Sequence, residues 1–278
     1  MLNSQLTNSQ LTIGFIGAGN MATALIEGLI RTGVAPGQLH ASDHNAEHLS
    51  PLAARGLRTS ANNATVAAAC DVVMLAVKPQ VLGGVLREVR EALCVRPRLL
   101  LSIAAGIQIH SLQAWTHPEQ AIVRCMPNTP ALVQAGASGL YANAAVSDAQ
   151  KQQATAILQA VGIVCWLEHE AQLDAVTALS GSGPAYFFLM MEAMEQAAIA
   201  LGLSAEVARP LCLQTAFGAA KLAIESAVEP GELRRRVTSP GGTTAAALAQ
   251  FEQGGYQELV ARALQAAASR AAELAAVN

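Results

Sequence analysis

Aromatic and charged side chains are scarce in this sequence. Aromatic residues make up 4% of the chain and charged residues 13%, whereas hydrophobic residues make up 52%. This balance excludes a disordered chain and predicts a core of aliphatic and alanine side chains. The formal net charge of −3 and the single short basic run, Arg234–Arg236, give no reason to expect a nucleic-acid partner. We interpret that run as a solvated face near a helix C-terminus, or alternatively as a group that steers anions toward a site.

Paired cysteines, a leader and long apolar runs are also lacking. The five cysteines are scattered without a C-x-x-C pair, which is typical of free thiols in a reducing compartment: Cys70, Cys94, Cys125, Cys165 and Cys212. No apolar run approaches the roughly 20 residues that cross a bilayer, and the N-terminus does not resemble a signal peptide. We therefore expect a cytoplasmic protein with no membrane partner. The pentapeptide Asn-Ser-Gln-Leu-Thr is repeated at residues 3–7 and 8–12, and residues 1–10 are expected to be disordered.

Short apolar runs alternate with helical patterns in residues 1–168. The expected strands are Leu11–Ile16, Leu39–Ser42, Val72–Val77, Leu99–Ile103 and Ala121–Cys125, with Gly139–Tyr141 and Ile163–Leu167 as further edge strands. Helical stretches such as Asn20–Arg31 separate most of them. This alternation predicts an α/β domain, in which helices cover both faces of a parallel sheet.

The pattern changes after Glu168, where strand-like runs stop. Residues 169–278 are rich in alanine and leucine, and the expected helices are Pro184–Leu201, Ala205–Ser226, Thr243–Phe251 and Tyr256–Val277. We assign this part to an all-α domain, a small bundle with apolar faces. Such a bundle often buries its surplus apolar surface against a second subunit, so a dimerisation role is expected.

A glycine-rich loop joins the first expected strand to the first helix. It reads Gly17-Ala18-Gly19-Asn20-Met21-Ala22. The first glycine permits a tight turn, the second lets the backbone approach a diphosphate, and the third small residue allows close packing of helix on strand. The helix N-terminus then offers free N–H groups to phosphates. The loop predicts a Rossmann-type dinucleotide site over residues 1–168; the alternative is a strand–helix turn without a ligand.

The residues after the second strand should face the adenosine ribose. An acid at this point, here Asp43, usually bonds the ribose 2′-hydroxyl and favours NAD. No arginine stands beside it for a 2′-phosphate, although Ser42 and His44 offer weaker contacts. The residues alone therefore favour NAD, or the use of both cofactors.

A lysine follows the strand expected at Val72–Val77. The sequence there reads Ala76-Val77-Lys78-Pro79. Strand ends in a Rossmann sheet face the cofactor, so we expect this segment to contact the ribose or nicotinamide region. The alternative is an exposed lysine at a strand end. Pro79 suits the first position of a helix.

Together with later loops, these features give a resemblance to the pyrroline-5-carboxylate reductases. It covers nearly the whole chain after Leu11 and rests on six blocks: Phe15–Ala22, Ala76–Pro79, Ser102–Gly106, Arg124–Pro130, Asp174–Tyr186 and Ser239–Thr244. The last two are the most specific.

The resemblance implies NAD(P)H-dependent reduction of 1-pyrroline-5-carboxylate to L-proline, the last step of proline biosynthesis. It also implies a Rossmann domain followed by helical domains that interlock into a homodimer, with a decamer in some members, and a substrate site at the dimer seam. Many members prefer NADPH and accept NADH. We therefore expect NADP(H), with NAD(H) as the alternative, against the preference suggested by Asp43.

Roles for individual residues follow from the same resemblance. Ser239, Gly242 and Thr243 are expected to bind the substrate carboxylate, and Thr244 to bond the ring nitrogen as the catalytic residue. Further expected contacts are Ser182 near substrate and nicotinamide, Asn128 at the nicotinamide pocket and Asn63 near the adenine ribose. Ser239–Thr244 precedes a helix, which makes it a natural carboxylate site; a plain helix cap is the alternative. Ser180–Pro184 is likewise expected to begin a helix.

The sequence departs from the pattern of this family at Ala227, where many members have a glutamate. Glu225 and Glu229 lie nearby in sequence, so a carboxylate partner for the substrate amine is not assigned. No strong general acid is visible; Tyr186 is a weak candidate, and a core role fits it better.

Two other functions remain open. A β-hydroxyacid dehydrogenase would need a lysine base on the first long helix of the second domain, but the only lysine after residue 168 is Lys221. A non-enzymatic dinucleotide-binding protein would bind cofactor without turnover. No metal site is expected, because His40, His44 and His48 do not share one helical face.

Overall fold

The computed structural model of the chain describes residue 6 and residues 11–277. Disorder is expected in residues 1–10. Except for residue 6, these residues lie outside the described part of the chain. The chain forms two compact units. We call residues 1–182 with 267–278 the sheet unit, and residues 183–266 the helical unit.

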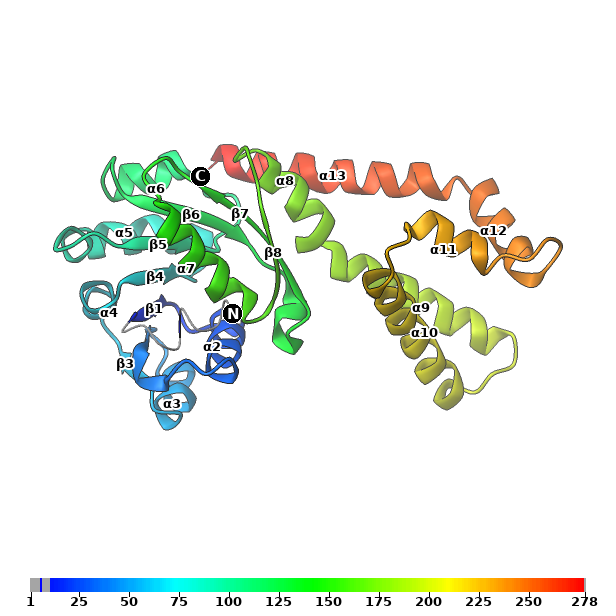
Figure 1. The fold of residues 1–278 in the computed structure, drawn as a ribbon, viewed down its shortest axis with the longest axis horizontal. Helices are drawn as coiled ribbons and strands as arrows, with labels where there is room; N and C mark the ends of the chain where they lie inside the picture. Colours follow the sequence, from blue (N-terminus) through cyan, green and yellow to red (C-terminus); the bar gives the residue numbers. More distant parts are fainter. Residues whose placement is uncertain (1–5, 7–10, 278) are drawn as a thin grey trace. The chain divides into compact units, whose positions relative to one another are not determined.

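Eight strands in the described part of the sheet unit form one sheet (Figure 1). They are β1 (Ile13–Ile16), β2 (Leu39–Ser42), β3 (Arg58–Ser60), β4 (Val72–Leu75), β5 (Leu99–Ser102), β6 (Ala121–Met126), β7 (Gly136–Ala142) and β8 (Gly162–Trp166). Their order is β3-β2-β1-β4-β5-β6-β7-β8. β1 thus has β2 on one side and β4 on the other, as in doubly wound sheets. The predicted Rossmann-type fold is confirmed, and β3 is a strand that the sequence analysis missed.

The prediction of a parallel sheet is wrong at one pair, because β6 and β7 are antiparallel. Parallel neighbours need a crossover of a dozen or more residues, but β6 ends at Met126 and β7 begins at Gly136. The link holds a 3-10 turn over Thr129–Val133, followed by Gln134 in the left-handed region at φ 59°. So short a link returns the chain beside β6 in the opposite direction.

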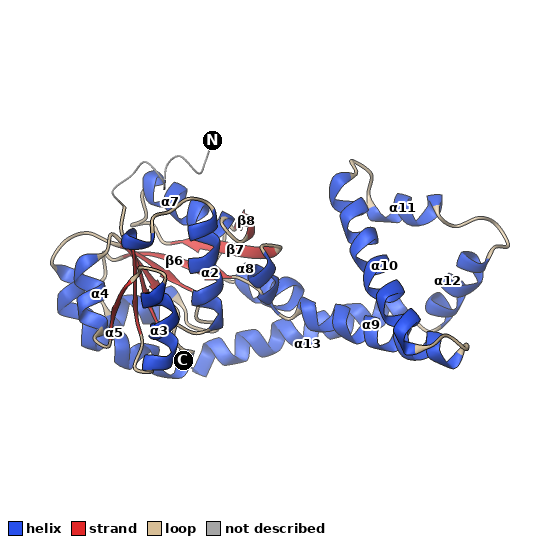
Figure 2. Ribbon diagram, turned by 90° about the horizontal axis from the view of Figure 1, so that it is seen from below, coloured by secondary structure: helices blue, strands red, loops and turns tan. Residues whose placement is uncertain are grey.

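Helices cover the sheet on both faces, as predicted (Figure 2). One face packs against α2 (Asn20–Arg31), α3 (Ala46–Ala54) and α7 (Asp148–Gln159), the other against α4 (Asn63–Ala69), α5 (Pro79–Cys94) and α6 (Ile109–Trp115). Each face has its own aliphatic core. The strands between these layers, β1, β2, β4 and β5, are buried along their whole length, which explains their nearly unbroken apolar sequences.

The compact units divide after Ser182, whereas the sequence analysis placed the boundary between residues 168 and 169. The reason is that α8 (Gln172–Val176) packs on β6 and β7. The end of α13 (Tyr256–Val277) also belongs to the sheet unit, where it lies against Gly106. The change of composition after residue 168 marks the last strand, and the packing of the sheet unit extends beyond it.

The helical unit contains α9 (Gly183–Ala200), α10 (Ala205–Glu225), α11 (Pro230–Arg236), α12 (Thr243–Gln253) and the first part of α13. α9, α10, α12 and α13 agree with the predicted helices. α11 was not among them, but the basic run Arg234–Arg236 forms its last turn, as interpreted. α9 packs against α10 (Figure 1). None of the helices in the described residues is long and apolar enough to span a membrane.

The helical unit has almost no core of its own. Among its described residues, the only buried hydrophobic side chains are those of Ala208 and Cys212. Large apolar side chains on α9 and α10 are instead exposed in the single chain: Phe187, Phe188, Leu189, Met194, Ile199, Val207, Leu211, Leu213, Phe217, Leu222 and Ile224. An apolar surface of this extent marks a protein interface.

Candidate active site

The glycine-rich loop turns sharply after β1. Gly17 has φ +96°, and its N–H donates to the carbonyl oxygen of Ser42 at 2.8 Å. A Cβ at this position would lie 2.7 Å from the backbone oxygen of Ala76. The turn therefore requires glycine for its backbone conformation and for the close approach of the segment after β4.

Gly19, in contrast, has open space where a Cβ would lie. It is the N-cap of α2, and a Cβ built on it would have no protein atom within 4 Å. No side chain caps this helix, and its first turn holds no acid. The N–H groups of Asn20 and Met21 thus begin a twelve-residue helix that no side chain caps, beside the open space at Gly19. This arrangement fits a dinucleotide diphosphate, which needs backbone donors, a positive helix end and room for close contact.

Asp43 lies directly after β2 but is turned into the loop. One carboxylate oxygen accepts the N–H of Ala18 at 2.8 Å, and the other accepts the N–H of Asn45 at 2.9 Å. Burial alone would raise the pKa of Asp43; the hydrogen bonds from Asn45 and Ala18 and the contact with His48 outweigh it and hold that pKa below its usual value. Asp43 is therefore an anion that fixes the loop, which weakens the sequence argument for a ribose contact and for NAD.

Two residues predicted for the adenosine side lie in direct contact. The Ser42 hydroxyl, at the end of β2, donates to Oδ1 of Asn63 at 2.9 Å. Asn63 is the first residue of α4, and its Nδ2 lies 3.5 Å from a carboxylate oxygen of Glu88. The predicted pair is thus brought together beside the glycine-rich loop.

The segment after β4 begins a helix as predicted, with Pro79 first in α5 and Lys78 as its N-cap. Ala76 donates its N–H to the carbonyl oxygen of Ile16 at 2.8 Å, which holds the segment beside the end of β1. Lys78 is exposed, and within the described residues its ammonium group has no hydrogen bond or ion pair. It is free to meet a ligand at this edge.

Asn128, predicted at the nicotinamide pocket, uses its amide within the protein. Its Nδ2 donates to the carbonyl oxygen of Ser180 at 3.1 Å, and its Oδ1 accepts the N–H of Ala137 at 2.9 Å. The side chain is buried. Asn128 thus ties the loop after β6 to the segment that carries Ser180.

The prediction that Ser180–Pro184 begins a helix is confirmed, because α9 starts at Gly183. The segment before it was not predicted. The chain is already helical in α8 and then forms a π-helical segment over Thr177–Gly181, in which Ser182 donates its N–H to the carbonyl oxygen of Thr177 at 2.8 Å. Short π-helical segments are frequent at functional sites. The Ser-Gly repeat allows the inserted residue because its side chains are small, and a Cβ at Gly181 would lie 2.6 Å from Cε of Met126.

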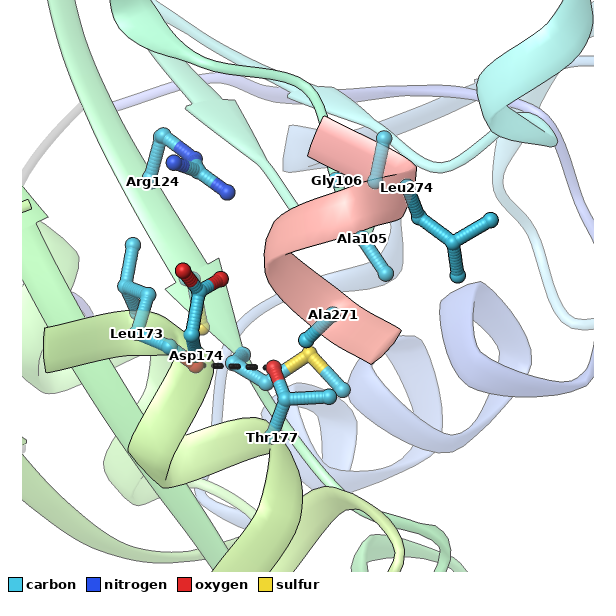
Figure 3. A pocket seen from close by; sticks show the side chains of 11 residues that line it. Ala105, Gly106, Arg124, Leu173, Asp174, Thr177, Ala271 and Leu274 are labelled. Atoms are coloured by element: carbon cyan, nitrogen blue, oxygen red, sulfur yellow. Dashed lines mark hydrogen bonds between the residues drawn. The ribbon is translucent and has the colours of Figure 1, made fainter. Parts of the chain in front are cut away.

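A small cavity in the sheet unit adjoins this segment (Figure 3). It has a volume of about 40 Å³, room for a few water molecules. Residues after β5, the end of β6, α8 and the end of α13 line it. Arg124 donates to Glu170 at 2.7 Å, and the same oxygen of Glu170 accepts the N–H of Ile109 at 2.7 Å.

Asp174 also faces this cavity (Figure 3). Within the described residues its carboxylate accepts no hydrogen bond. Burial raises the pKa of Asp174, opposed by Arg124 and reinforced by Glu170. This arrangement was not predictable, because nothing in a linear pattern signals that Arg124 and Glu170 lie near Asp174.

The Ser239–Thr244 segment forms the N-terminus of α12 in the helical unit. Gly241 has φ +69°, and Gly242 is the N-cap and donates its N–H to the carbonyl oxygen of Ser239 at 3.1 Å. No side chain caps the helix, so the alternative of a plain Ser/Thr cap is not supported. In the described structure the hydroxyls of Ser239, Thr243 and Thr244 make no hydrogen bond. The three hydroxyls are thus free donors suited to a carboxylate, whereas the N–H of Gly242 is already bonded within the turn.

Other candidates have less support. Tyr186 is half-buried on α9, and Ala227 is exposed between α10 and α11. Lys221 lies on α10, not α9, and pairs with exposed Glu225 at 2.6 Å, which argues against a dehydrogenase base. The described residues contain no group of three or more potential metal ligands.

Two family profiles match the chain. Residues 170–274 match the family described as pyrroline-5-carboxylate reductase dimerisation, and residues 12–106 match the family described as NADP oxidoreductase, coenzyme F420-dependent. The first match begins just before α8, and the second contains the glycine-rich loop.

Full-length relatives agree with these matches. The pyrroline-5-carboxylate reductase of Pseudomonas aeruginosa is 56% identical and covers 95% of this chain and 96% of its own. A structure of a pyrroline-5-carboxylate reductase from Coxiella burnetii is 43% identical with a TM-score of 0.93 and covers 96% of this chain and 99% of its own. The Plasmodium falciparum pyrroline carboxylate reductase, solved with NADP bound, is 31% identical with a TM-score of 0.85, covering 95% of this chain and 98% of its own.

Proposed function

The chain belongs to the pyrroline-5-carboxylate reductase family, and from that membership we propose which of its residues carry out the reaction. As an oxidoreductase of this family, it uses NAD(P)H to reduce 1-pyrroline-5-carboxylate to L-proline, the last step of proline biosynthesis. The observation that supports our assignment is a pair of uncapped helix N-termini. One, at α2, suits a diphosphate, and the other, at α12, suits a carboxylate.

The dinucleotide is assigned to the loop Gly17–Met21. Backbone N–H groups at the start of α2 bind the diphosphate, Ser42 and Asn63 lie on the adenosine side, and the segment Ala76–Pro79 contacts the ribose nearer the nicotinamide. A bound nicotinamide supplies the hydride. Asn128 is assigned to the nicotinamide side, where its two hydrogen bonds hold the π-helical segment against the loop after β6.

The substrate carboxylate is assigned to the start of α12. The donors are the Ser239 hydroxyl and the backbone N–H groups of Thr243 and Gly242, with no side chain capping the helix. The N–H of Gly242 donates to the carbonyl oxygen of Ser239 in this structure and would have to share its hydrogen bond with the substrate. The Thr244 hydroxyl bonds the ring nitrogen and so fixes the angle at which the C=N carbon faces the nicotinamide. When the imine is protonated, hydride adds to its carbon and the π electron pair moves to nitrogen, which leaves a neutral amine and requires no further proton.

A homodimer is part of this proposal. The family match to a dimerisation domain and the exposed apolar faces of α9 and α10 support association through the helical units. We propose that these helices interlock between two chains, that the substrate site lies at their seam with Ser182 beside it, and that dimers either remain dimers or assemble into a decamer. Five free cysteines support a reducing location, which we propose to be the cytoplasm.

The test is turnover by the purified full chain with 1-pyrroline-5-carboxylate and NADPH or NADH, followed by loss of nicotinamide absorbance. We expect activity in the wild type. In Thr244→Ala, kcat/KM should fall about tenfold or more while cofactor affinity stays unchanged, because only a substrate hydrogen bond is lost. Thr244→Ser keeps the hydroxyl and should recover most of the activity. No turnover with either cofactor, or equal kcat/KM in the wild type and Thr244→Ala, contradicts the assignment.

A further inference from the structure

Two imidazoles flank Asp43 at the end of β2. Nδ1 of His48, in the first turn of α3, lies 3.2 Å from one carboxylate oxygen, and Nδ1 of His44 lies 3.4 Å from the other. The Asp43 side chain is 8% exposed, whereas that of His48 is 47% and that of His44 is 100% exposed. Asp43 is thus buried, and the imidazoles of His44 and His48 are exposed to solvent at the end of β2.

The hydrogen bonds of Asp43 leave it little capacity for a ribose. Its two oxygens already accept the N–H groups of Ala18 and Asn45. An acid that selects NAD must offer free oxygens to the ribose hydroxyls, and this carboxylate is committed to the loop instead. Residues next to Asp43, and not Asp43 itself, must therefore distinguish NADP(H) from NAD(H) at the end of β2.

The contact with Asp43 determines which nitrogen of His48 carries a proton. An ionised carboxylate only accepts, so Nδ1 must be the donor across the 3.2 Å contact. The neutral ring then has an unprotonated Nε2, which repels a phosphate oxygen. Only the imidazolium form carries a second N–H that a phosphate can accept.

Two acids and one arginine lie near β2. Arg58 lies on β3 in register with His40, two residues before Ser42 on β2, and its charge acts on His40. Glu47 precedes His48 on α3, and Glu88 of α5 lies 3.5 Å from Nδ2 of Asn63. The loop Gly17–Met21, Ser42 and the residues at the start of α4 carry no charge. His44 and His48 are therefore the groups in direct contact with Asp43 that can supply cationic charge to an anionic ligand at the end of β2.

We propose that His44 and His48 are the residues that recognise the 2′-phosphate of NADP(H), that Asp43 is the positioning residue that holds them, and that binding this phosphate takes up a proton. The proposal rests on the function assigned above, because it requires the adenosine ribose to lie beyond β2. The carboxylate holds the ring of His48 through Nδ1–H, and the phosphate accepts from the Nε2–H of the protonated ring. NAD(H) lacks the 2′-phosphate and takes up no proton here.

Calorimetric titration of the full chain with NADP+ and with NAD+ tests the proposal without turnover. In His48→Gln, and further in His44→Gln/His48→Gln, the dissociation constant for NADP+ should rise about tenfold or more, because a charge-assisted hydrogen bond is lost. The constant for NAD+ should change less than about twofold. His117→Gln, a histidine in the loop after α6, is the matched control and should bind both as the wild type does.

Proton uptake is the second measurement. Repeating the NADP+ titration near pH 7.5 in two buffers of different ionisation enthalpy gives the number of protons bound. Wild type should take up more protons than His48→Gln, and its preference for NADP+ over NAD+ should weaken as the pH rises from about 6 to 8.5. The phosphate itself titrates near about pH 6, so wild type and variant are compared at each pH.

Unchanged NADP+ affinity in the double variant, or equal proton uptake in wild type and His48→Gln, overturns the proposal. Failure of the assigned function would look different. In that case neither dinucleotide would support turnover of pyrroline carboxylate, whereas a failure confined to the two histidines would leave the turnover with NADH and with NADPH intact.

Discussion

At the scale of single residues, substitutions of the two loop glycines should have different effects on stability and on dinucleotide binding. Gly19→Ala should keep the stability of the folded chain within about 1 kcal/mol, because the added Cβ meets no protein atom. Dinucleotide binding should nevertheless weaken about tenfold or more, since overpacking a tight contact costs about 1–3 kcal/mol. Titration with NADP+ and thermal unfolding measure the two effects.

Gly17→Ala is the matched comparison. Its φ of +96° and the backbone oxygen 2.7 Å from the new Cβ make the substitution strained without any ligand, so the folded chain should lose about 2 kcal/mol or more. If Gly19→Ala unfolds as readily as Gly17→Ala, or binds NADP+ like wild type, the diphosphate is not held at this loop.

The sequence predicted the residues of the loop better than the role of Asp43. Glycine spacing depends on the local backbone, so the turn after β1 follows from five or six adjacent residues. The direction of the Asp43 carboxylate depends on which N–H groups the folded loop leaves open, here those of Ala18 and Asn45. A pattern along the chain contains no such information.

At the scale of elements, one buried arginine caps the C-terminal ends of two helices. Arg98 is 2% exposed and donates to carbonyl oxygens at the ends of α4 and α5 and beyond them: Ala68, Cys70, Ala92, Leu93 and Arg96. These oxygens belong to the unsatisfied last turns and carry the negative ends of the helix dipoles. The guanidinium thus anchors both helices to the start of β5.

Arg98→Met should therefore destabilise the chain by about 3 kcal/mol, because several buried carbonyls lose their donor at once. Arg98→Lys keeps the charge but not the planar set of donors, and should fall between wild type and Arg98→Met. Denaturant unfolding followed by circular dichroism measures the difference. Equal stability of Arg98→Met and wild type would mean that water replaces the guanidinium without cost.

Elements with clear periodicity were predictable and those without it were not. The inner strands and the long helices follow from apolar patterns. β3 has the sequence Arg-Thr-Ser, which contains no apolar residue, and it pairs only because it follows α3 beside β2. The start of α9 at Gly183 was predictable from the serine, glycine and proline residues around it. The π-helical segment before it was not, because these residue types favour both helix caps and irregular helical turns.

At the scale of the whole molecule, the exposed apolar faces of the helical unit predict association. Phe217 on α10 is 61% exposed in the single chain. Phe217→Glu should place a charge in the interface, shift the sedimenting species from dimer or larger toward the single chain, and reduce activity with it. Analytical ultracentrifugation over a range of concentrations measures the shift.

Val95→Glu is the matched control, because Val95 is 74% exposed in the sheet unit at the end of α5. It should leave both the association state and the turnover unchanged. If Phe217→Glu associates as tightly as wild type, the apolar face of α10 does not form the dimer contact.

The division into units was the least predictable feature, since it depends on contacts between distant residues. Composition indicated where strands stop, but not that α8 would pack on β6 and β7, nor that the end of α13 would reach Gly106. Such contacts join residues far apart in the sequence and leave no periodic signal.

The chain leaves the sheet unit after Ser182 and re-enters it at Ala267, so the helical unit is an insertion between two parts of one domain. An insertion has two covalent tethers instead of one, which restricts the rotation that a single linker would permit. It also makes folding order matter. During synthesis the sheet unit lacks its final helical turns until the ribosome has released the entire insertion, so the cavity beside Asp174 is completed last.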